Sequence, residues 1–254
     1  MGAAPPSGYL APGGVRVLAH QGLARSAPPN TLLAFLAALS TGATHLETDV
    51  HVTLDDIAVI SHDPVFRNRG RNVRISQLTF LELAGIRLAD GQAVPSLAEA
   101  LTAFPDARFN IDVKVDGAVA ATIRSVRDCG ATDRVLITSF SQSRRRAAVV
   151  GLPGVASSPS SAEFTKVLAS AQLGSSGLTR RLLQGFVAVQ VPERAGPLHL
   201  VTERFVRRMH AAGAEVHVWT VNDPRAMTRL LDLGVDGIVT DRCDLLSELL
   251  SART

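Results

Sequence analysis

Ionisable residues alternate with apolar ones in two short segments of this 254-residue chain. Glu47 and Asp49 lie two apart in His-Leu-Glu-Thr-Asp-Val, and Asp112 and Lys114 lie two apart in Asn-Ile-Asp-Val-Lys. Residues i and i+2 of a strand share a face, so each segment is expected to send two charged side chains to one side. Only two of the 26 Lys and Arg residues are lysines. The compact ammonium of Lys114 suits a position beside a phosphate or a metal-bound oxygen, where a planar guanidinium fits poorly.

Three carboxylates with no thiolate in their segments predict a site for a hard divalent cation. Glu47, Asp49 and Asp112 offer oxygen ligands, which suit Mg²⁺ or Ca²⁺ better than Zn²⁺. A bound ion would offset the repulsion among converging carboxylates, and it could bridge a phosphate oxygen and an attacking hydroxyl. His20 and His62 follow two other strand-like segments, and imidazole titrates close to neutral pH. These histidines are therefore expected to act as general base and general acid on opposite sides of a phosphorus atom.

Short β-branched runs alternate with helical patterns along the chain, which predicts an α/β fold with a parallel sheet built from βαβ units. About eight such units over roughly 240 residues match the size of a (β/α)8 TIM barrel, whose active sites lie at the carboxyl ends of the strands. A doubly wound open sheet is the alternative, but the chain has no G-x-G-x-x-G after its first strand and no G-x-x-x-x-G-K-[ST] motif. The expected strands are 15–19, 45–53, 58–61, 108–114, 135–138, a weak one near 155, 186–191, 215–220 and 237–239, and the expected helices are 31–40, 96–104, 117–129, 141–149, 162–173, 202–212, 224–233 and 244–250.

A single barrel domain is expected over residues 15–254. Residues 64–95 break the rhythm and are rich in Arg, which predicts a short insertion after the second strand unit with a helical turn around 78–84. Residues 1–14 are rich in Ala, Pro and Gly and predict a flexible leader. No run reaches the roughly 18 apolar residues of a membrane helix. Stable membrane insertion is therefore not expected, and a cytoplasmic location follows by default.

The composition predicts a folded chain that acts on a small molecule. Hydrophobic residues make up 46% and charged residues 19%, which provides for a full core and argues against disorder. The net charge of +3 slightly favours phosphate-bearing ligands, but no basic stripe with interleaved aromatic residues indicates nucleic acid binding. Cys129 and Cys243 lie far apart without metal-type spacing and predict buried thiols. The oligomeric state stays open.

The motifs taken together resemble the glycerophosphodiester phosphodiesterase family. The resemblance runs in order from about Val15 to Asp241, and its motifs are His20-Gln21-Gly22, Pro29-Asn30-Thr31, Glu47-Thr48-Asp49-Val50, His62-Asp63-Pro64, Asp112-Val113-Lys114, Trp219-Thr220-Val221-Asn222 and Gly237-Ile238-Val239-Thr240-Asp241. It implies a (β/α)8 barrel that uses a divalent cation to hydrolyse glycerophosphodiesters to glycerol 3-phosphate and an alcohol. It also implies that the glycerol's own vicinal hydroxyl attacks phosphorus to give a cyclic phosphate.

Carried over residue by residue, the resemblance assigns a role to each chemistry-bearing position. Metal binding falls to Glu47, Asp49 and Asp112, acid and base roles fall to His20 and His62, and stabilisation of the phosphate charge falls to Lys114. Trp219, the only Trp, is expected to flank the pocket and contact glycerol carbons or the leaving alcohol. The alternative for Trp219 is an aromatic residue that only packs the barrel.

The chain departs from the family pattern at three places. The family's His-Arg-Gly reads His20-Gln21-Gly22 here, so Gln21 offers the substrate phosphate a neutral amide in place of a charged bidentate donor. The family's Pro-Glu-Asn-Thr has Pro29 in place of Glu, and the usual Glu of the third strand is Asp112. One of the insertion arginines is hypothesised to replace the missing guanidinium; they are Arg67, Arg69, Arg71 and Arg74.

Two other functions stay open on the same scaffold. One is a lipid phosphodiesterase that resembles the lysophospholipase D or sphingomyelinase D relatives, which long apolar loops at the barrel mouth would favour. The other is a catalytically impaired phosphodiester-binding protein, which the changes at Gln21 and Pro29 would favour. The presence of both His20 and His62 argues for an enzyme, because a binding protein has no evident need of two titrating groups.

Overall fold

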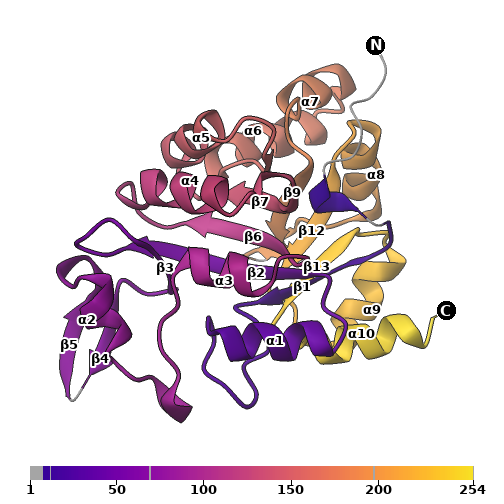
Figure 1. Cartoon of the computed structure of the whole chain (residues 1–254). Coiled ribbons are helices and arrows are strands. Elements are labelled where there is room, and N and C mark those ends of the chain that lie inside the picture. Colours follow the sequence, from indigo (N-terminus) through magenta and orange to yellow (C-terminus); the bar gives the residue numbers. More distant parts are fainter. Residues whose placement is uncertain (1–7, 12, 69, 197, 254) are drawn as a thin grey trace.

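The computed structural model describes residues 8–11, 13–68, 70–196 and 198–253. In these residues eight parallel strands form a nearly closed barrel, in the order β8-β7-β6-β2-β1-β13-β12-β9 (Figure 1). The barrel strands are β1 (Arg16–His20), β2 (His45–Val52), β6 (Arg108–Val113), β7 (Val135–Thr138), β8 (Ala156–Ser157), β9 (Ala188–Pro192), β12 (Glu215–Trp219) and β13 (Gly237–Thr240). The expected TIM barrel is confirmed, and the open-sheet alternative is wrong.

Helices surround the barrel and follow most of its strands. They are α1 (Leu32–Ser40), α3 (Leu97–Ala103), α4 (Ala118–Asp128), α5 (Gln142–Gly151), α6 (Ser161–Gln172), α7 (Ser176–Leu182), α8 (Glu203–Ala211), α9 (Pro224–Asp232) and α10 (Cys243–Ser251). Side-chain caps begin several of them, since Thr31, Ser141, Thr202 and Asp223 each accept a hydrogen bond from a first-turn backbone N–H. None of the described helices has the length and apolar character to span a membrane.

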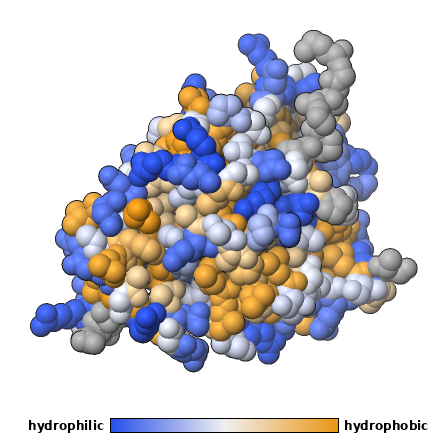
Figure 2. All heavy atoms as spheres, in the orientation of Figure 1, coloured by the Kyte–Doolittle hydropathy of each residue, from blue (hydrophilic) through white to orange (hydrophobic). Residues whose placement is uncertain are grey.

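The main core lies between the strands and the helices. It includes fully buried residues of the strands and of the helices that cover them, such as Phe35, Leu46, Phe109 and Leu246. α1 carries apolar residues on its outer side as well. Leu33 and Leu36 are 40% and 52% exposed, and Figure 2 shows apolar side chains gathered over this helix in the lower part of the view.

The barrel is least complete between β8 and β9. β8 has two residues and pairs with β7, and in the described part of the chain it forms no ladder with β9. The hydrogen bond that the Val187 N–H donates to Ser157 O, at 3.1 Å, connects the two sides. Two helices, α6 and α7, lie between β8 and β9 in the chain. α7 is not among the expected helices, and glycines are typical of loops, yet Gly174 precedes it and Gly177 lies in its first turn.

The expected insertion stands out from the carboxyl end of β2 (Figure 1). β3 (Ala58–Ile60) folds back antiparallel on the end of β2, and Ile60 N–H donates to Pro95 O at 2.9 Å across the base of the insertion. Val59, Ile75, Leu83 and Val94 form a small separate core. The insertion contains the hairpin of β4 (Val65–Asn68) and β5 (Arg71–Arg74), the 3-10 turns η2 (Ile75–Gln77) and η3 (Ala89–Gly91), and α2 (Phe80–Ala84).

The amino end of the barrel is closed by part of the expected leader. Gly8–Leu10 forms the 3-10 turn η1, and Tyr9 is fully buried with its ring edge-on to His45 at 4.7 Å. His45 Nε2 lies 2.8 Å from Tyr9 O, and Arg108 Nε donates to Gly8 O at 3.0 Å. A flexible leader is therefore wrong for residues 8–11, because an aromatic ring fills the end of the barrel. Residues 1–7 lie outside the described residues.

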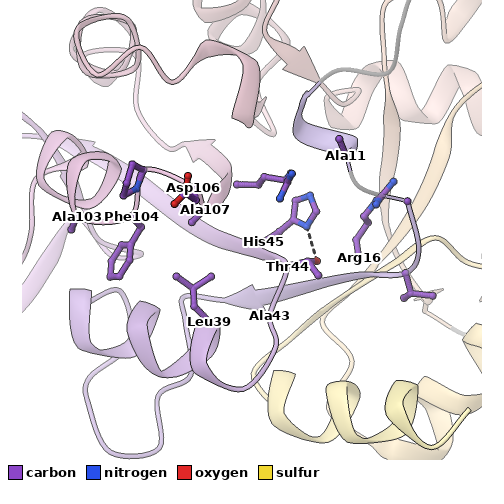
Figure 3. A pocket seen from close by; sticks show the side chains of 14 residues that line it. Ala11, Arg16, Leu39, Ala43, Thr44, His45, Ala103, Phe104, Asp106 and Ala107 are labelled. Carbon is purple, nitrogen blue, oxygen red and sulfur yellow. Dashed lines mark hydrogen bonds between the residues drawn. The ribbon is translucent and has the colours of Figure 1, made fainter. Parts of the chain in front are cut away.

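A cavity of about 500 Å³ opens beside this closed end (Figure 3). Arg16, Leu39, Thr44, His45 and Phe104 are among its lining residues. Thr44 Oγ1 lies 2.8 Å from His45 Nδ1, as the dashed line in Figure 3 marks. None of the residues predicted for catalysis or metal binding lies here.

A short antiparallel ribbon follows β9. It consists of β10 (Arg194–Ala195) and β11 (Leu198–His199). Both cysteines are free thiols; Cys243 is buried as expected, whereas Cys129 is only partly buried.

Candidate active site

A cavity of about 630 Å³ opens at the carboxyl ends of the barrel strands. Seven of the eight residues predicted from the sequence line it, and they are His20, Glu47, Asp49, His62, Asp112, Lys114 and Trp219. They meet because parallel strands all end on the same side of the barrel. The eighth residue, Gln21, lies beside the cavity and bonds to one of the seven.

Lys114 lies between two carboxylates at the centre of the charged side. Its Nζ is 2.6 Å from Asp49 Oδ1 and 2.7 Å from Asp112 Oδ2. The two aspartates are register partners in the β2–β6 pair, so their side chains leave the sheet at the same level. Burial lowers the pKa of Lys114, but the charges of Asp112 and Asp49 outweigh burial and raise it. Lys114 is therefore cationic at neutral pH.

Gln21 uses its side-chain amide to hold Asp49. Its backbone adopts a left-handed conformation with φ of 56°, and Nε2 donates to Asp49 Oδ2 at 3.0 Å. Asn30 Nδ2 approaches the same oxygen at 3.4 Å, and Thr48 Oγ1 fixes Asn30 by donating to its Oδ1 at 2.8 Å. Both oxygens of Asp49 are thus hydrogen-bonded. The side-chain amide of Gln21 therefore orients the Asp49 carboxylate. The contact with the substrate phosphate that the sequence predicts for Gln21 stays a prediction.

Glu47 is a buried carboxylate of the site. Burial and the nearby charge of Asp49 together raise the pKa of Glu47 to about 8. Glu47 Oε2 accepts from the Gln21 N–H at 3.3 Å and lies 3.9 Å from His20 Nε2. An added positive charge near these atoms would therefore return Glu47 to its ionised form.

His20 is oriented by a chain of polar side chains. Its Nδ1 lies 2.7 Å from Asp241 Oδ1, and Asn222 Nδ2 donates to Asp241 Oδ2 at 2.6 Å. Burial lowers the pKa of His20, but the hydrogen bond with Asp241 and the charge of Glu47 outweigh it, so the net pKa is raised. Because a carboxylate only accepts, Nδ1 carries the hydrogen. Nε2 is then the nitrogen on the side of Glu47 and the cavity.

His62 reaches the cavity from the returning strand β3. Ser61 N–H donates to Asp49 O at 3.0 Å, which brings His62 back beside the charged side. The side chain of His62 is 57% exposed, and its Nδ1 lies 2.9 Å from Asp63 Oδ1. His51 Nε2 lies 3.2 Å from the backbone oxygen of His62 and supports the loop. The two histidines thus approach the cavity from different elements, β1 and the loop after β3.

The donor chemistry of the site fits a hard divalent cation. Glu47, Asp49 and Asp112 all face the cavity, and Asp112 Oδ1 is buried with no hydrogen-bond partner among the described residues. In their present positions the side chains do not form a ligand group, since no set of three or more described His, Cys, Asp or Glu residues is arranged to hold a metal. Lys114 takes the space between the two aspartates. A cation would therefore compete with Lys114 for their oxygens.

Trp219 lies on the opposite, uncharged side of the cavity. Its ring meets that of Phe140 edge-on, with centroids 6.2 Å apart, and the Phe140 ring centroid is 6.0 Å from Lys114 Nζ. Trp219 thus lines the cavity, and its contact with substrate stays a prediction. Phe140 is 62% exposed and places an aromatic surface at the edge of the charged side.

Several site residues were missed from the sequence. Asp241 and Asn222 stand in the quoted motifs, but the contact of Asp241 with His20 spans 221 positions and leaves no local signal, and Asn222 acts through Asp241. Asn110, two residues before Asp112, lines the cavity with its Oδ1 unpaired among the described residues. Asn110 alternates with Asp112 and Lys114 at a spacing of two residues, so the sequence could have predicted that it shares their face of the strand. Arg71 and Arg74 of the insertion are exposed and do not line the cavity, while the Arg67 side chain and Arg69 lie outside the described residues.

Comparison with known proteins agrees with this geometry. The pattern of the glycerophosphoryl diester phosphodiesterase family matches residues 20–245, from the first histidine of the site to α10. The chain belongs to this family. It is 40% identical over 255 residues to the probable glycerophosphodiester phosphodiesterase 2 of Mycobacterium tuberculosis, which covers 99% of this chain and 97% of that protein. As a member of the family, the chain is a phosphoric diester hydrolase.

Solved structures of the family share the barrel. A phosphodiesterase from Silicibacter pomeroyi superposes with a TM-score of 0.78 at 23% identity, over 97% of this chain and 98% of that one. A phosphodiesterase from Oleispira antarctica, in complex with the product sn-glycerol-3-phosphate, gives a TM-score of 0.75 at 21% identity, over 94% and 97% of the two chains. The fold of the family therefore extends over nearly the whole of this chain.

Proposed function

We propose that this chain hydrolyses glycerophosphodiesters to glycerol 3-phosphate and an alcohol, with two histidines and a divalent cation. The observation that carries the proposal is that His20 and His62 reach one cavity together with Lys114 and three carboxylates. The product complex of the Oleispira antarctica relative supports the same substrate class. The proposed partner of the protein is therefore a small-molecule glycerophosphodiester and not nucleic acid. A cytoplasmic location stays a prediction.

His20 is the proposed general base. Its Nδ1 is held by Asp241, which stabilises the imidazolium that forms when Nε2 takes up a proton. The proton comes from the glycerol hydroxyl next to the phosphate ester, whose oxygen attacks phosphorus. His62, more exposed at the mouth of the cavity, donates a proton to the oxygen of the leaving alcohol. Water then opens the resulting cyclic phosphate, with the roles of the histidines reversed.

Lys114 is the proposed counter-charge for the phosphate. Its ammonium pairs with Asp49 and Asp112, and Lys114 also lines the cavity. Glu47, Asp49 and Asp112 would hold Mg²⁺ or Ca²⁺, with Gln21 orienting Asp49. When bound, such a cation would supply positive charge to a phosphate oxygen and to the attacking hydroxyl.

Release of glycerol 3-phosphate tests the reaction. Glycerophosphocholine and glycerophosphoethanolamine are incubated with the native chain in Mg²⁺, Ca²⁺ or EDTA, and the same assay is run on His20→Ala. We expect cation-dependent release that falls by about 10²–10⁴-fold in the variant. A native chain that is silent with every cation, yet binds glycerophosphocholine, would instead indicate a phosphodiester-binding protein.

An analogue identifies the attacking oxygen. A glycerophosphodiester that lacks the hydroxyl next to the phosphate ester has no internal nucleophile, so we expect no cleavage above background. Cleavage of this analogue at the native rate would show that water attacks directly.

A further inference from the structure

The cavity of about 500 Å³ at the amino end of the barrel, here called the amino-end cavity, is separate from the catalytic cavity. The two cavities have no lining residue in common. Arg16, His45 and Arg108 line the amino-end cavity, and they are the first residues of β1, β2 and β6. The predicted site residues of the same strands lie further along them and line the catalytic cavity. A molecule in the amino-end cavity would therefore not contact the catalytic groups.

Most of the lining of the amino-end cavity is apolar. Nine of its 14 lining residues are apolar or Gly, as in small-molecule sites where a few polar groups fix the orientation of the ligand. Leu39 comes from the last turn of α1 and Phe104 directly follows α3, and both are only partly buried. In Figure 3 Leu39 points from α1 into the cavity, with Phe104 on one side of it and His45 on the other. These side chains offer a surface for an apolar group.

Two of the polar residues in this lining contribute no net charge. Arg16 pairs with Glu215, its Nη2 lying 2.8 Å from Glu215 Oε1. His45 is 1% exposed, and its Nε2 donates to Tyr9 O at 2.8 Å. Burial, together with the charges of neighbouring arginines, lowers the pKa of His45 to about 3. The imidazole is therefore neutral at neutral pH, and the charge of Arg16 is balanced.

Arg108 lines the same cavity and lacks an acidic partner in the described part of the chain. Its Nε donates to Gly8 O at 3.0 Å, which fixes the plane of the guanidinium. Its two terminal nitrogens have no hydrogen-bond partner among the described residues. Asp106, the acidic residue of the described lining, is exposed and does not pair with Arg108. A guanidinium held in this way presents two N–H donors that match a carboxylate.

We propose that the amino-end cavity binds a small monocarboxylate with an apolar body. The terminal nitrogens of Arg108 receive the carboxylate, and Leu39 and Phe104 contact the apolar part. Repulsion by Asp106 disfavours a ligand with a second negative charge, such as a phosphate dianion. The inference does not depend on the proposed function, because the two cavities share no lining residue.

An NMR titration tests both the place and the chemistry of binding. Phenylacetate and its neutral analogue phenylacetamide are added to the isotope-labelled native protein in excess glycerol 3-phosphate, which occupies the catalytic cavity. We expect saturable amide shifts in residues 13–16, 39–45 and 103–108. The Kd of phenylacetate should be about ten- to hundredfold below that of phenylacetamide, because its hydrogen bonds to Arg108 are charge-assisted. Equal Kd values, no saturable binding, or shifts confined to the catalytic cavity would each overturn the proposal.

Matched variants locate the carboxylate. Arg108→Gln should raise the Kd of phenylacetate to that of phenylacetamide. Arg87→Gln, at an exposed arginine that lines neither cavity, should leave both Kd values as in the native protein. A native preference for phenylacetate that persists in folded Arg108→Gln would overturn the proposal.

Asp106→Asn tests the same site from the opposite sign of charge. The repelling carboxylate is removed, so phenylacetate should bind about two- to fivefold tighter while phenylacetamide binds as before. Far-UV circular dichroism checks that each variant is folded. If Arg108→Gln does not fold, Asp106→Asn decides, and an unchanged Kd for phenylacetate in that variant would then reject the site.

Discussion

At the level of single residues, His20 depends on side chains from the far end of the chain. Asp241 fixes Nδ1, and Asn222 fixes Asp241 through its second oxygen while accepting from Thr240 Oγ1 at 3.0 Å. The imidazole is therefore held in one tautomer and one orientation. His62 has a simpler environment, with the exposed Asp63 as its side-chain partner. The two histidines should respond differently to loss of their aspartates.

Asp241→Asn removes the charge that supports the His20 imidazolium and permits the wrong tautomer. We expect kcat to fall by roughly 10²–10⁴-fold with little change in KM. The matched change Asp63→Asn at the other histidine should cost less than about threefold, because that pair is solvent-screened. Steady-state kinetics on glycerophosphocholine measure both. Equal losses in the two variants would contradict the assigned difference.

Lys114→Met leaves Asp49 and Asp112 without their ammonium partner. A divalent cation then meets no competitor for these oxygens, so we expect tighter Mg²⁺ or Ca²⁺ binding in calorimetry, by about tenfold or more. Hydrolysis should nevertheless fall, since the counter-charge for the phosphate is lost. Lys166→Met, at the other lysine on exposed α6 surface, is the control and should alter neither quantity. Cation affinity that is unchanged in Lys114→Met would place the ion elsewhere.

Residue types and strand spacing sufficed to predict that the candidate site residues share one cavity. Period-two spacing predicts a shared face for Glu47 and Asp49 and for Asp112 and Lys114, and barrel topology does the rest. The hydrogen-bond partners of these side chains could not be predicted from the sequence. The bond between the Gln21 amide and Asp49 depends on a left-handed backbone at Gln21, which nothing in the sequence indicates for this residue type.

At the level of elements, α5 fixes the end of the strand that carries the charged centre. Arg144 Nη1 donates to Val113 O at 3.1 Å and also to Lys114 O, while Nε donates to Asp116 Oδ1 at 2.9 Å. One guanidinium thus holds the backbone immediately after β6. The position of Lys114 between its two aspartates depends on this backbone.

Arg144→Gln should loosen the end of β6. We expect kcat/KM to fall about tenfold, because the backbone at Lys114 loses a charged donor, and the free energy of unfolding to fall by about 1–3 kcal/mol. Arg146→Gln, two positions along on the exposed side of α5, should change neither. Kinetics and urea unfolding report the two effects. Native kinetics in Arg144→Gln would show that the end of β6 needs no such support.

Element prediction failed where local signals competed with packing. Gly174 and Gly177 are typical of a loop, but α7 begins at Ser176 and includes Gly177, and its Thr179 is buried. Gly and Pro in residues 1–14 indicate flexibility, but burial of Tyr9 at the end of the barrel orders residues 8–11. Strands and helices with strong periodicity were predicted to within a few residues. The elements that were missed, α7 and residues 8–11, depend on burial against distant parts of the chain, which no local pattern shows.

At the level of the whole molecule, the amino end of the barrel is stabilised by charge as well as by Tyr9. Arg16 Nη2 lies 2.8 Å from Glu215 Oε1 and joins β1 to β12, two strands separated by β13. His217 Nε2 lies 3.0 Å from the other oxygen of Glu215. Burial raises the pKa of Glu215, but the hydrogen bonds from His217 and Arg16 outweigh it and lower the pKa to about 2.

This lowered pKa predicts acid sensitivity. The unfolded carboxyl takes up a proton near its model value of 4.5, while the folded one stays ionised down to about 2. The contribution of Glu215 is therefore complete above about pH 4.5 and is lost as pH falls towards 2, at about 1.4 kcal/mol per pH unit. Glu215→Gln should flatten the pH dependence of unfolding in this window. Glu203→Gln, at an exposed helical pair with Arg207, should not.

The incomplete pairing of β8 with β9 gives the barrel a seam on one side only. The Val187 amide lies at this seam, so we expect its hydrogen to exchange with solvent sooner than amides inside the β2–β6 ladder. Both helices between the two strands lie on that side, and α6 contributes Phe164 and Leu168 to the lining of the catalytic cavity. The charged residues of the cavity come from continuous sheet and from the segments that follow it, whereas α6 adjoins the seam. Opening of the seam would therefore change the width of the cavity on the α6 side and leave the predicted catalytic groups in place.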